Sequence, residues 1–315
     1  MTRVLTFDNS HIERAKEIAL MNYNEEREIV KALPNIDTVP DLNVFADNGL
    51  GVALFDDNEM LGFLCCYKPR DNFFFSEAKG VFSPIQAHGA LCENRAKIYT
   101  KLYEAAADKW VSDKITYHAI TVYANDRYAI SSLFDLGFGK RCVDAVRELS
   151  DNTYKTPEGL SFLELQKGEA AKIRDLRNQL NFHLRESPSF MRFSKEHIEN
   201  WLKGAQERDS RLFAAAKAGE SMAYIEVTDE GENFITSAEK MKNIQGAFCA
   251  KQYRGKGVFE ELLNYVMKEL KSEGYTSLGV DFESFNPAAN AFWLKDFKAY
   301  TNSLTRRLDE CVLKY

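Results

Sequence analysis

Two kinds of hydrophobic pattern recur along the 315-residue chain. Apolar residues spaced three or four positions apart predict amphipathic helices at residues 11–33, 95–111, 170–184, 195–205 and 258–271. Shorter apolar or alternating runs predict strands at residues 4–7, 51–55, 61–67, 118–122, 161–165, 211–216, 222–227, 244–250, 277–282 and 303–308. Residues 73–88 show neither pattern and are expected to be irregular. This order of strands and helices predicts a mixed α/β fold built around a sheet.

The predicted elements follow the same order in both halves of the chain, which indicates a duplicated domain. In each half a strand leads to an asparagine that opens a short helix, Asn125 in the first half and Asn286 in the second. Between the halves, residues 151–159 are polar and rich in turn-forming residues. We therefore predict a first domain at residues 1–150, a linker at 151–159 and a second domain at 160–315.

Composition narrows the class of protein. With 45% hydrophobic and 28% charged residues, the chain is typical of a soluble globular protein. Its net charge of −6 and its dispersed basic residues give no electrostatic reason to expect a nucleic-acid partner. No apolar run is long enough to span a membrane, and the first residues lack the apolar core of a signal peptide. The six cysteines form no CxxC pair and have no histidine at ligand spacing, so we expect reduced thiols, no metal site and a cytoplasmic protein.

Candidate chemistry is concentrated in one connection between a predicted strand and a predicted helix. Residues 251–257 form this connection and end in Arg254, Gly255, Lys256 and Gly257. Glycine adopts positive φ without strain and lets a bulky anion approach closely, and the first turn of a helix offers unpaired N–H donors and the positive end of the helix dipole. The combination predicts a site for a phosphate or pyrophosphate group. The structural alternative is an ordinary strand-to-helix turn, and the spacing is not that of a nucleotide-binding P-loop.

Two motifs carry a resemblance to a known family. Residues 252–257 (QYRGKG) match a [QR]-x-x-G-x-[GA] pyrophosphate-loop motif, and residues 286–293 (NPAANAFW) resemble a second motif of the same family. With the order of the surrounding elements, residues 160–309 resemble the GNAT superfamily of N-acetyltransferases. Residues 1–150 share the element order, but residues 83–90 stand in place of the loop motif and lack its Arg-Gly-Lys-Gly pattern. The resemblance implies two tandem GNAT-like acyl-CoA N-acyltransferase domains, of which the first is a degenerate copy that does not bind CoA tightly.

The resemblance also implies a cosubstrate and its contacts. Acetyl-CoA would place its pyrophosphate on the loop and on the start of helix 258–271, and its pantetheine arm along strand 244–250, where this strand splays from strand 277–282. The residues expected to contact acetyl-CoA are Phe248, Cys249, Ala250, Gln252, Tyr253, Arg254, Gly255, Lys256, Gly257, Val258, Asn286 and Trp293. Family members often carry a tyrosine on the helix of the second motif, which would protonate the leaving thiolate. Here that place holds Phe292 and Trp293, which have no phenolic hydroxyl.

The residues that would move protons are less well marked by the sequence. Glu283, at the end of a predicted strand, and Glu226, on the strand before the loop, are candidates to accept the proton of an amine, and a salt bridge or a solvated strand end explains either carboxylate equally well. Asn286 is expected to cap its helix, and Cys249 to pack in its strand. His88 and His183 receive no role.

The function predicted from the sequence is therefore transfer of an acetyl group from acetyl-CoA to a primary amine of a small molecule or peptide. The alternative is a non-catalytic acyl-CoA-binding regulatory module, which the missing tyrosine favours. We expect no metal, nucleic-acid or membrane partner, and a homodimer is left open.

Overall fold

The computed structural model describes residues 2–150, 153–194, 196–207 and 210–314, which form two compact units. Unit 1 consists of Met1–Val143 together with Ala299–Tyr315, and unit 2 consists of Asp144–Lys298. The units thus group residues differently from the predicted domains 1–150 and 160–315, because the C-terminal segment joins unit 1. The first two residues of the predicted linker, 151 and 152, lie outside the described residues.

Unit 1 contains both antiparallel and parallel strand pairs. Strands β1, β2, β3 and β5 form an antiparallel sheet in that order. Strand β4 runs parallel to β6, and β6 pairs antiparallel with β13. The elements are β1 (Thr2–Thr6), α1 (Ile12–Ile29), α2 (Asn43–Ala46), β2 (Val52–Asp56), β3 (Glu59–Leu64), β4 (Gly80–Ser83), β5 (His88–Ala90), α3 (Arg95–Ser112), β6 (Tyr117–Tyr123), α4 (Arg127–Asp135), the first part of β7 (Gly139–Glu148) and β13 (Lys298–Arg307).

The helices of unit 1 lie close to where the hydrophobic pattern predicts them. One of its short strands was not predicted. Helix α3 was predicted at 95–111, and Ile98, Leu102, Ala106 and Trp110, spaced four residues apart, are all buried on one face. The Trp110 indole N–H donates to the carbonyl of Leu50 at 3.1 Å. Helix α1 ends at Ile29, four residues before its predicted end. Strand β4 lies in residues 73–88, so the expectation that this whole segment is irregular was wrong.

Unit 2 has a single sheet with strand order β12-β11-β10-β9-β8, and β7 lies next to β12. Pairing is antiparallel from β8 to β11 and parallel between β11 and β12, which confirms the predicted mixed α/β class. The elements are β8 (Ser161–Leu165), α5 (Arg174–Arg185), α6 (His197–Glu207), β9 (Arg211–Lys217), β10 (Glu220–Thr228), β11 (Met241–Cys249), α7 (Val258–Ser272), β12 (Ser277–Glu283) and α8 (Pro287–Asp296).

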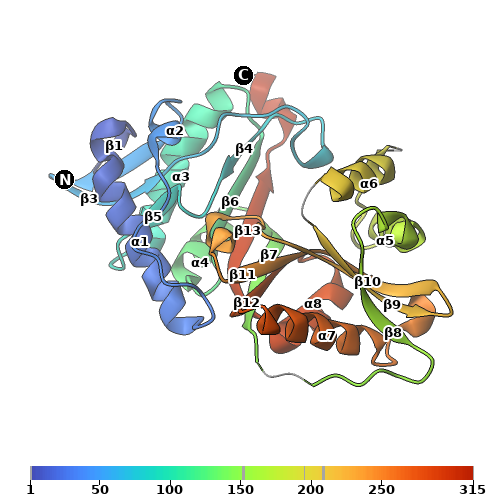
Figure 1. The fold of residues 1–315 in the computed structure, drawn as a ribbon. Helices are drawn as coiled ribbons and strands as arrows, with labels where there is room; N and C mark the ends of the chain where they lie inside the picture. Colours follow the sequence, from blue (N-terminus) through green and yellow to red (C-terminus); the bar gives the residue numbers. More distant parts are fainter. Residues whose placement is uncertain (1, 151–152, 195, 208–209, 315) are drawn as a thin grey trace. The chain divides into compact units, whose positions relative to one another are not determined.

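Helices cover both faces of the unit 2 sheet. Helices α5 and α6 lie on one face and helices α7 and α8 on the other (Figure 1). The predicted face of α7 is buried through Leu262, Val266, Met267 and Leu270, whereas Phe259, expected on that face, is only half-buried. No helix in the described ranges is both long and apolar enough to cross a membrane.

Candidate functional site

An opening forms where β11 and β12 separate. The parallel register runs from Met241 opposite Ser277 to Ile244 opposite Val280, although β11 continues to Cys249 and β12 to Glu283. On its other edge, β11 stays paired with β10, but the register shifts there, with Glu226 opposite Gly246 and Val227 opposite Ile244. Gln245 is therefore an extra residue, and such a β-bulge bends its strand. The bend explains the splay that the resemblance implied between these two strands.

The connection after β11 is shaped by two glycines in the left-handed region. Gly255 has φ +70° and Gly257 has φ +76°, a conformation that other residues adopt only at a cost. A Cβ atom built on either glycine would meet no atom within 4 Å, so the loop is open to a ligand. Gly257 is the N-cap of the 15-residue helix α7 and provides no side-chain cap. The N–H groups of the first turn and the positive end of the helix dipole therefore face this open loop.

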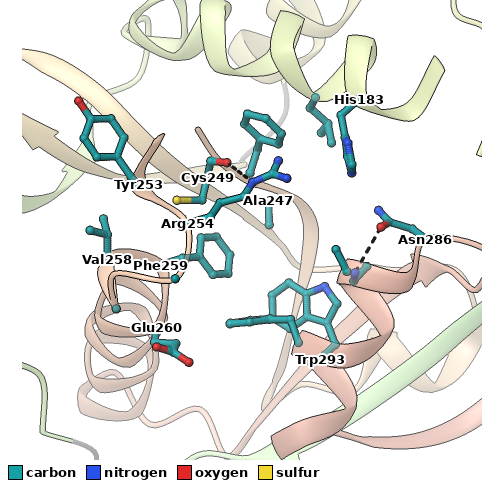
Figure 2. A pocket seen from close by; sticks show the side chains of 17 residues that line it. His183, Ala247, Cys249, Tyr253, Arg254, Val258, Phe259, Glu260, Asn286 and Trp293 are labelled. Atoms are coloured by element: carbon teal, nitrogen blue, oxygen red, sulfur yellow. Dashed lines mark hydrogen bonds between the residues drawn. The ribbon is translucent and has the colours of Figure 1, made fainter. Parts of the chain in front are cut away.

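The side chain of Arg254 lies against the end of β11. Its Nε donates to the carbonyl of Cys249 at 2.9 Å, and its guanidinium carbon lies 4.9 Å from the ring centre of Phe248 (Figure 2). The Cys249 carbonyl therefore points away from β10, toward the opening. Ala250 differs, because its N–H donates to Met222 and its carbonyl accepts from Tyr253, both at 2.9 Å. Since alternate residues of a strand direct their backbone groups to opposite edges, the groups facing the opening belong to Ala247 and Cys249. The backbone groups of Ala250, which was also expected to contact the cosubstrate, are already hydrogen-bonded within the protein.

Loop, strand end and α8 together enclose a cavity of about 330 Å³ (Figure 2). Most of the residues predicted to contact the cosubstrate line it: Phe248, Cys249, Tyr253, Arg254, Gly255, Gly257, Val258, Asn286 and Trp293. The others predicted, Ala250, Gln252 and Lys256, are not part of its wall, and Gln252 and Lys256 are exposed to solvent. The sequence missed Leu180 and His183 of α5, Ala247, and the aromatic rings of Phe259 and Phe292. Ala247 could have been found from the strand it shares with Phe248, whereas nothing in the sequence connects α5 with the loop.

Helix α8 closes the cavity from the side opposite α5. The Asn286 side chain accepts the N–H of Ala289 at 3.3 Å, which confirms the predicted N-cap. About two turns further, Trp293 is 6% exposed and packs edge-to-face with Phe259, Phe292 and Phe297, at ring separations of 5.9, 4.9 and 5.3 Å. An aromatic cluster therefore forms this part of the cavity wall, where many members of the resembled family carry a tyrosine hydroxyl.

The two predicted carboxylates lie outside the cavity wall. Glu226 is 1% exposed and accepts the Trp201 indole N–H at 2.9 Å, with Arg177 Nη1 at 3.9 Å. It lies over Gly246, since a Cβ there would be 3.1 Å from the carboxylate. Glu283 is half-buried at the end of β12, and burial together with the nearby carboxylates of Glu232, Asp144 and Glu283 raises the pKa of Asp281. A role for Glu226 or Glu283 in proton transfer remains a prediction.

The remaining candidates for a nucleophile or a metal site are the cysteines and any cluster of ligating side chains. Cys249 is 8% exposed, and burial raises the pKa of its thiol despite the opposing effect of Arg254, which agrees with packing rather than reactivity. All six cysteines are free. Across the described ranges, no group of three or more His, Cys, Asp or Glu side chains is arranged to hold a metal ion.

Unit 1 contains the same succession of strand, loop, helix, strand and helix, but a buried arginine stands at the start of its helix. Only residues 91–94 separate β5 from α3, so this segment, and not residues 83–90, is the counterpart of the glycine loop. Arg95, the first residue of α3, is 7% exposed. Its Nη1 lies 3.1 Å from a carboxylate oxygen of Asp126, and its Nη2 donates to Glu25 at 2.9 Å.

A second cluster lies beside this one, at the start of α4. The N-cap of α4 is Asp126, whose side chain accepts the Ala129 N–H at 3.0 Å, and not Asn125 as the repeat suggested. Asn125 instead donates its backbone N–H and its side-chain amide to Glu26, at 3.1 and 2.7 Å. Burial outweighs these hydrogen bonds and raises the pKa of Glu26 to about 7.

Comparisons with known proteins agree with this fold. Residues 173–298 match the sequence model described as the Acetyltransferase (GNAT) family. No curated protein matches the chain in sequence. A GCN5-related N-acetyltransferase from Sphaerobacter thermophilus is similar in structure, with a TM-score of 0.60 at 13% identity, covering 97% of this chain and 95% of that one. An acetyltransferase of the GNAT family from Colwellia psychrerythraea has a TM-score of 0.50 at 11% identity, with coverage of 98% and 100%.

A third similar structure is a fungal one, described as a GCN5-related glucosamine N-acetyltransferase region of a multi-domain GH3 β-N-acetylglucosaminidase. It has a TM-score of 0.53 at 13% identity and covers 97% of this chain and 38% of that protein. The fold over nearly the whole chain is therefore like that of these GNAT acetyltransferases. Residues 173–298 are in addition similar in sequence to the GNAT family of acetyltransferases.

Proposed function

We propose that unit 2 binds acetyl-CoA and transfers its acetyl group to a primary amine of a small molecule or peptide. The observation that carries this proposal is the uncapped start of α7, which meets the open Gly255–Gly257 turn at one end of a cavity between the splayed strands. An anion-binding helix start joined to a narrow, largely apolar cavity fits a ligand with a charged end and a long uncharged arm.

The residues around the cavity fit the parts of this cosubstrate. The pyrophosphate would be held by the N–H groups of the glycine turn and of the first turn of α7. Each contact with a helix terminus contributes only ~0.3–1 kcal/mol at an exposed site, so several must act together. The outward backbone groups of Ala247 and Cys249 would pair with the amides of the pantetheine arm, as an added strand would. For the carbonyl of Cys249 to take part, the Arg254 side chain must first release it.

Acetyl-CoA supplies an acyl group already activated as a thioester. The chain's main contribution is then to hold the thioester and the amine together, and a backbone N–H directed at the reacting carbonyl stabilises the negative charge that develops on its oxygen. A thiolate leaves without a strong acid, so the phenolic hydroxyl missing at Phe292 and Trp293 does not prevent turnover.

The proposal is tested by incubating the protein with acetyl-CoA and a panel of primary amines while following the release of free CoA thiol. The panel includes amino sugars, because the fungal structure with the same fold is described as a glucosamine N-acetyltransferase, as well as polyamines and peptide N-termini. Turnover with at least one amine supports the proposal. Tight CoA binding by calorimetry without turnover on any amine supports the non-catalytic acyl-CoA-binding module, which the absence of a tyrosine at positions 292 and 293 favours.

A further inference from the structure

One histidine ring faces the cavity of unit 2. His183 comes from α5 and points across the cavity toward Asn286 at the start of α8 (Figure 2). It is half-buried, and its imidazole nitrogens make no hydrogen bond within the part of the chain that the structure describes. A polar ring that faces a cavity without a protein partner has both nitrogens ready for a ligand.

Among the ionisable groups in the cavity wall, His183 alone combines position and chemistry suited to proton transfer. Arg254 offers only N–H donors, Tyr253 offers a phenolic O–H, and burial raises the pKa of the Cys249 thiol. Glu260 lies on the first turn of α7, is exposed, and is 3.6 Å from the ammonium of Lys295. Imidazole is the side chain that both takes up and releases a proton near neutral pH.

The carboxylates considered from the sequence have other roles or other surroundings. Glu226 accepts a hydrogen bond from Trp201 and lies near Arg177 and Gly246, and Glu283 is not part of the cavity wall. A base must come within hydrogen-bond reach of the proton that it removes. Of these three side chains, only that of His183 faces the space in which the thioester would lie.

We propose that His183 is the proton-transfer residue of the acetyl transfer, an inference that rests on the proposed function. The amine nitrogen uses its lone pair to form the C–N bond to the acetyl carbon, and the C–S bond breaks with its electron pair going to sulfur. The imidazole takes the surplus proton from the nitrogen and gives it to the thiolate. The products are the neutral amide and free CoA thiol, and His183 returns to its starting state. One side chain thereby supplies both the base and the acid that the cavity otherwise lacks.

Kinetics of His183→Gln test the proposal with a matched substitution as control. His197→Gln makes the same change on α6, where the ring centre lies 4.6 Å from that of Phe193 and the side chain lies outside the cavity wall. We expect His183→Gln to lower kcat at least about a hundredfold and to abolish the acidic limb of the pH–rate profile. The Kd for CoA should change less than about threefold, and His197→Gln should leave both quantities near the native values. In His183→Ala, added imidazole should restore part of the rate.

The possible results separate this proposal from the function on which it rests. If the native protein turns over and His183→Gln keeps a third or more of kcat with an unchanged pH profile, His183 is not the proton-transfer residue and the proposed function stands. If the native protein acetylates no amine, both proposals fall.

Chemical modification supplies a measurement that does not depend on turnover. Diethyl pyrocarbonate should modify His183 in the free protein, and saturating CoA should protect it, whereas CoA should leave the modification of His197 unchanged. Both sites can be followed by peptide mass spectrometry. Equal modification of His183 with and without CoA would place the ring away from the bound cosubstrate and overturn the proposal.

Discussion

The two strand–loop–helix segments of this chain show how one succession of elements can leave the start of a helix open or place an ion pair beside it. In unit 2, helix α7 follows a glycine N-cap that provides no side-chain cap, and a Cβ atom on that glycine would meet no atom within 4 Å. In unit 1, the N-cap Asn94 of helix α3 likewise provides no side-chain cap, but the next residue, Arg95, has a buried guanidinium that is bound by Glu25 and Asp126. An open helix start attracts an external anion, whereas a buried cation at a helix start is already neutralised by these carboxylates. The charges beside the helix start, and not the succession of elements, therefore distinguish the two segments.

The largest expected effect on CoA binding comes from adding a carboxylate to the Gly255–Gly257 turn. Gly257→Asp or Gly255→Asp places a side chain at positive φ and a carboxylate where the pyrophosphate would bind, and should weaken CoA binding roughly a thousandfold, or about 4 kcal/mol. Calorimetric titration with CoA measures this loss. Gly274→Asp is the matched control, because Gly274 also has positive φ, at +94°, but follows the other end of α7. CoA affinity within tenfold of the native value in Gly257→Asp would refute the assignment of the loop.

Removing the ion pair at the start of α3 should lower the stability of unit 1 and leave CoA binding intact. Arg95→Met strips Asp126, itself 7% exposed, of its buried partner, so the free energy of unfolding of unit 1 should fall by about 3 kcal/mol. Arg254→Met, in the open segment, should cost less than about 1 kcal/mol of stability, because Arg254 is exposed and forms no ion pair with a described residue. Urea unfolding and CoA titration of both variants measure the contrast. Equal losses of stability in the two variants would mean that the Arg95–Asp126 ion pair does not stabilise unit 1.

The charge cluster of unit 1 should also make stability depend on pH. The pKa of Glu26 is about 7 in the folded protein, against an ordinary value of 4.5, so the folded state holds a proton that the unfolded state has lost between these values. The contribution of Glu26 to stability is therefore greatest below pH 4.5 and declines as pH rises toward 7, by at most about 3 kcal/mol. Glu26→Gln, which cannot lose a proton, should flatten this decline when melting temperatures are compared at pH 5 and pH 7.5. An unchanged slope would show that Glu26 titrates at its ordinary value.

The features that could be predicted from the sequence are those that depend on contiguous residues. The amphipathic face of α7, the Gly255–Gly257 turn and the Asn286 cap each arise within about fifteen residues, where local spacing and capping chemistry decide the structure. Strand β4 was missed because its four residues are too few to establish an alternating pattern. The cap of α4 was misplaced by one residue because asparagine and aspartate are both preferred N-cap residues. In the structure Asp126 accepts the Ala129 N–H, and Asn125 donates instead to the distant Glu26.

The rest of the site depends on residues that meet only after folding. His183 and Ala247 are separated by more than sixty positions, and the helix that carries His183 has no motif that refers to the loop. Likewise, the hydrophobic pattern predicted a strand at 303–308 but contained no information on which strand it would join. The structure pairs Thr301–Arg307 with Tyr117–Tyr123, and so places the C-terminal segment in unit 1.

That pairing has a consequence during synthesis of the protein. Strand β6 emerges from the ribosome early, but its partner β13 is translated only after all of unit 2. Until then the β13-facing edge of β6 lacks that partner, and unpaired strand edges invite association with other chains. The ribosome translates unit 2 through α8 before it translates β13. The folding of unit 1 is therefore completed last, although β1 is translated before any strand of unit 2. A nascent chain halted before residue 299 should therefore show a protease-sensitive unit 1, and release of the full chain should remove that sensitivity.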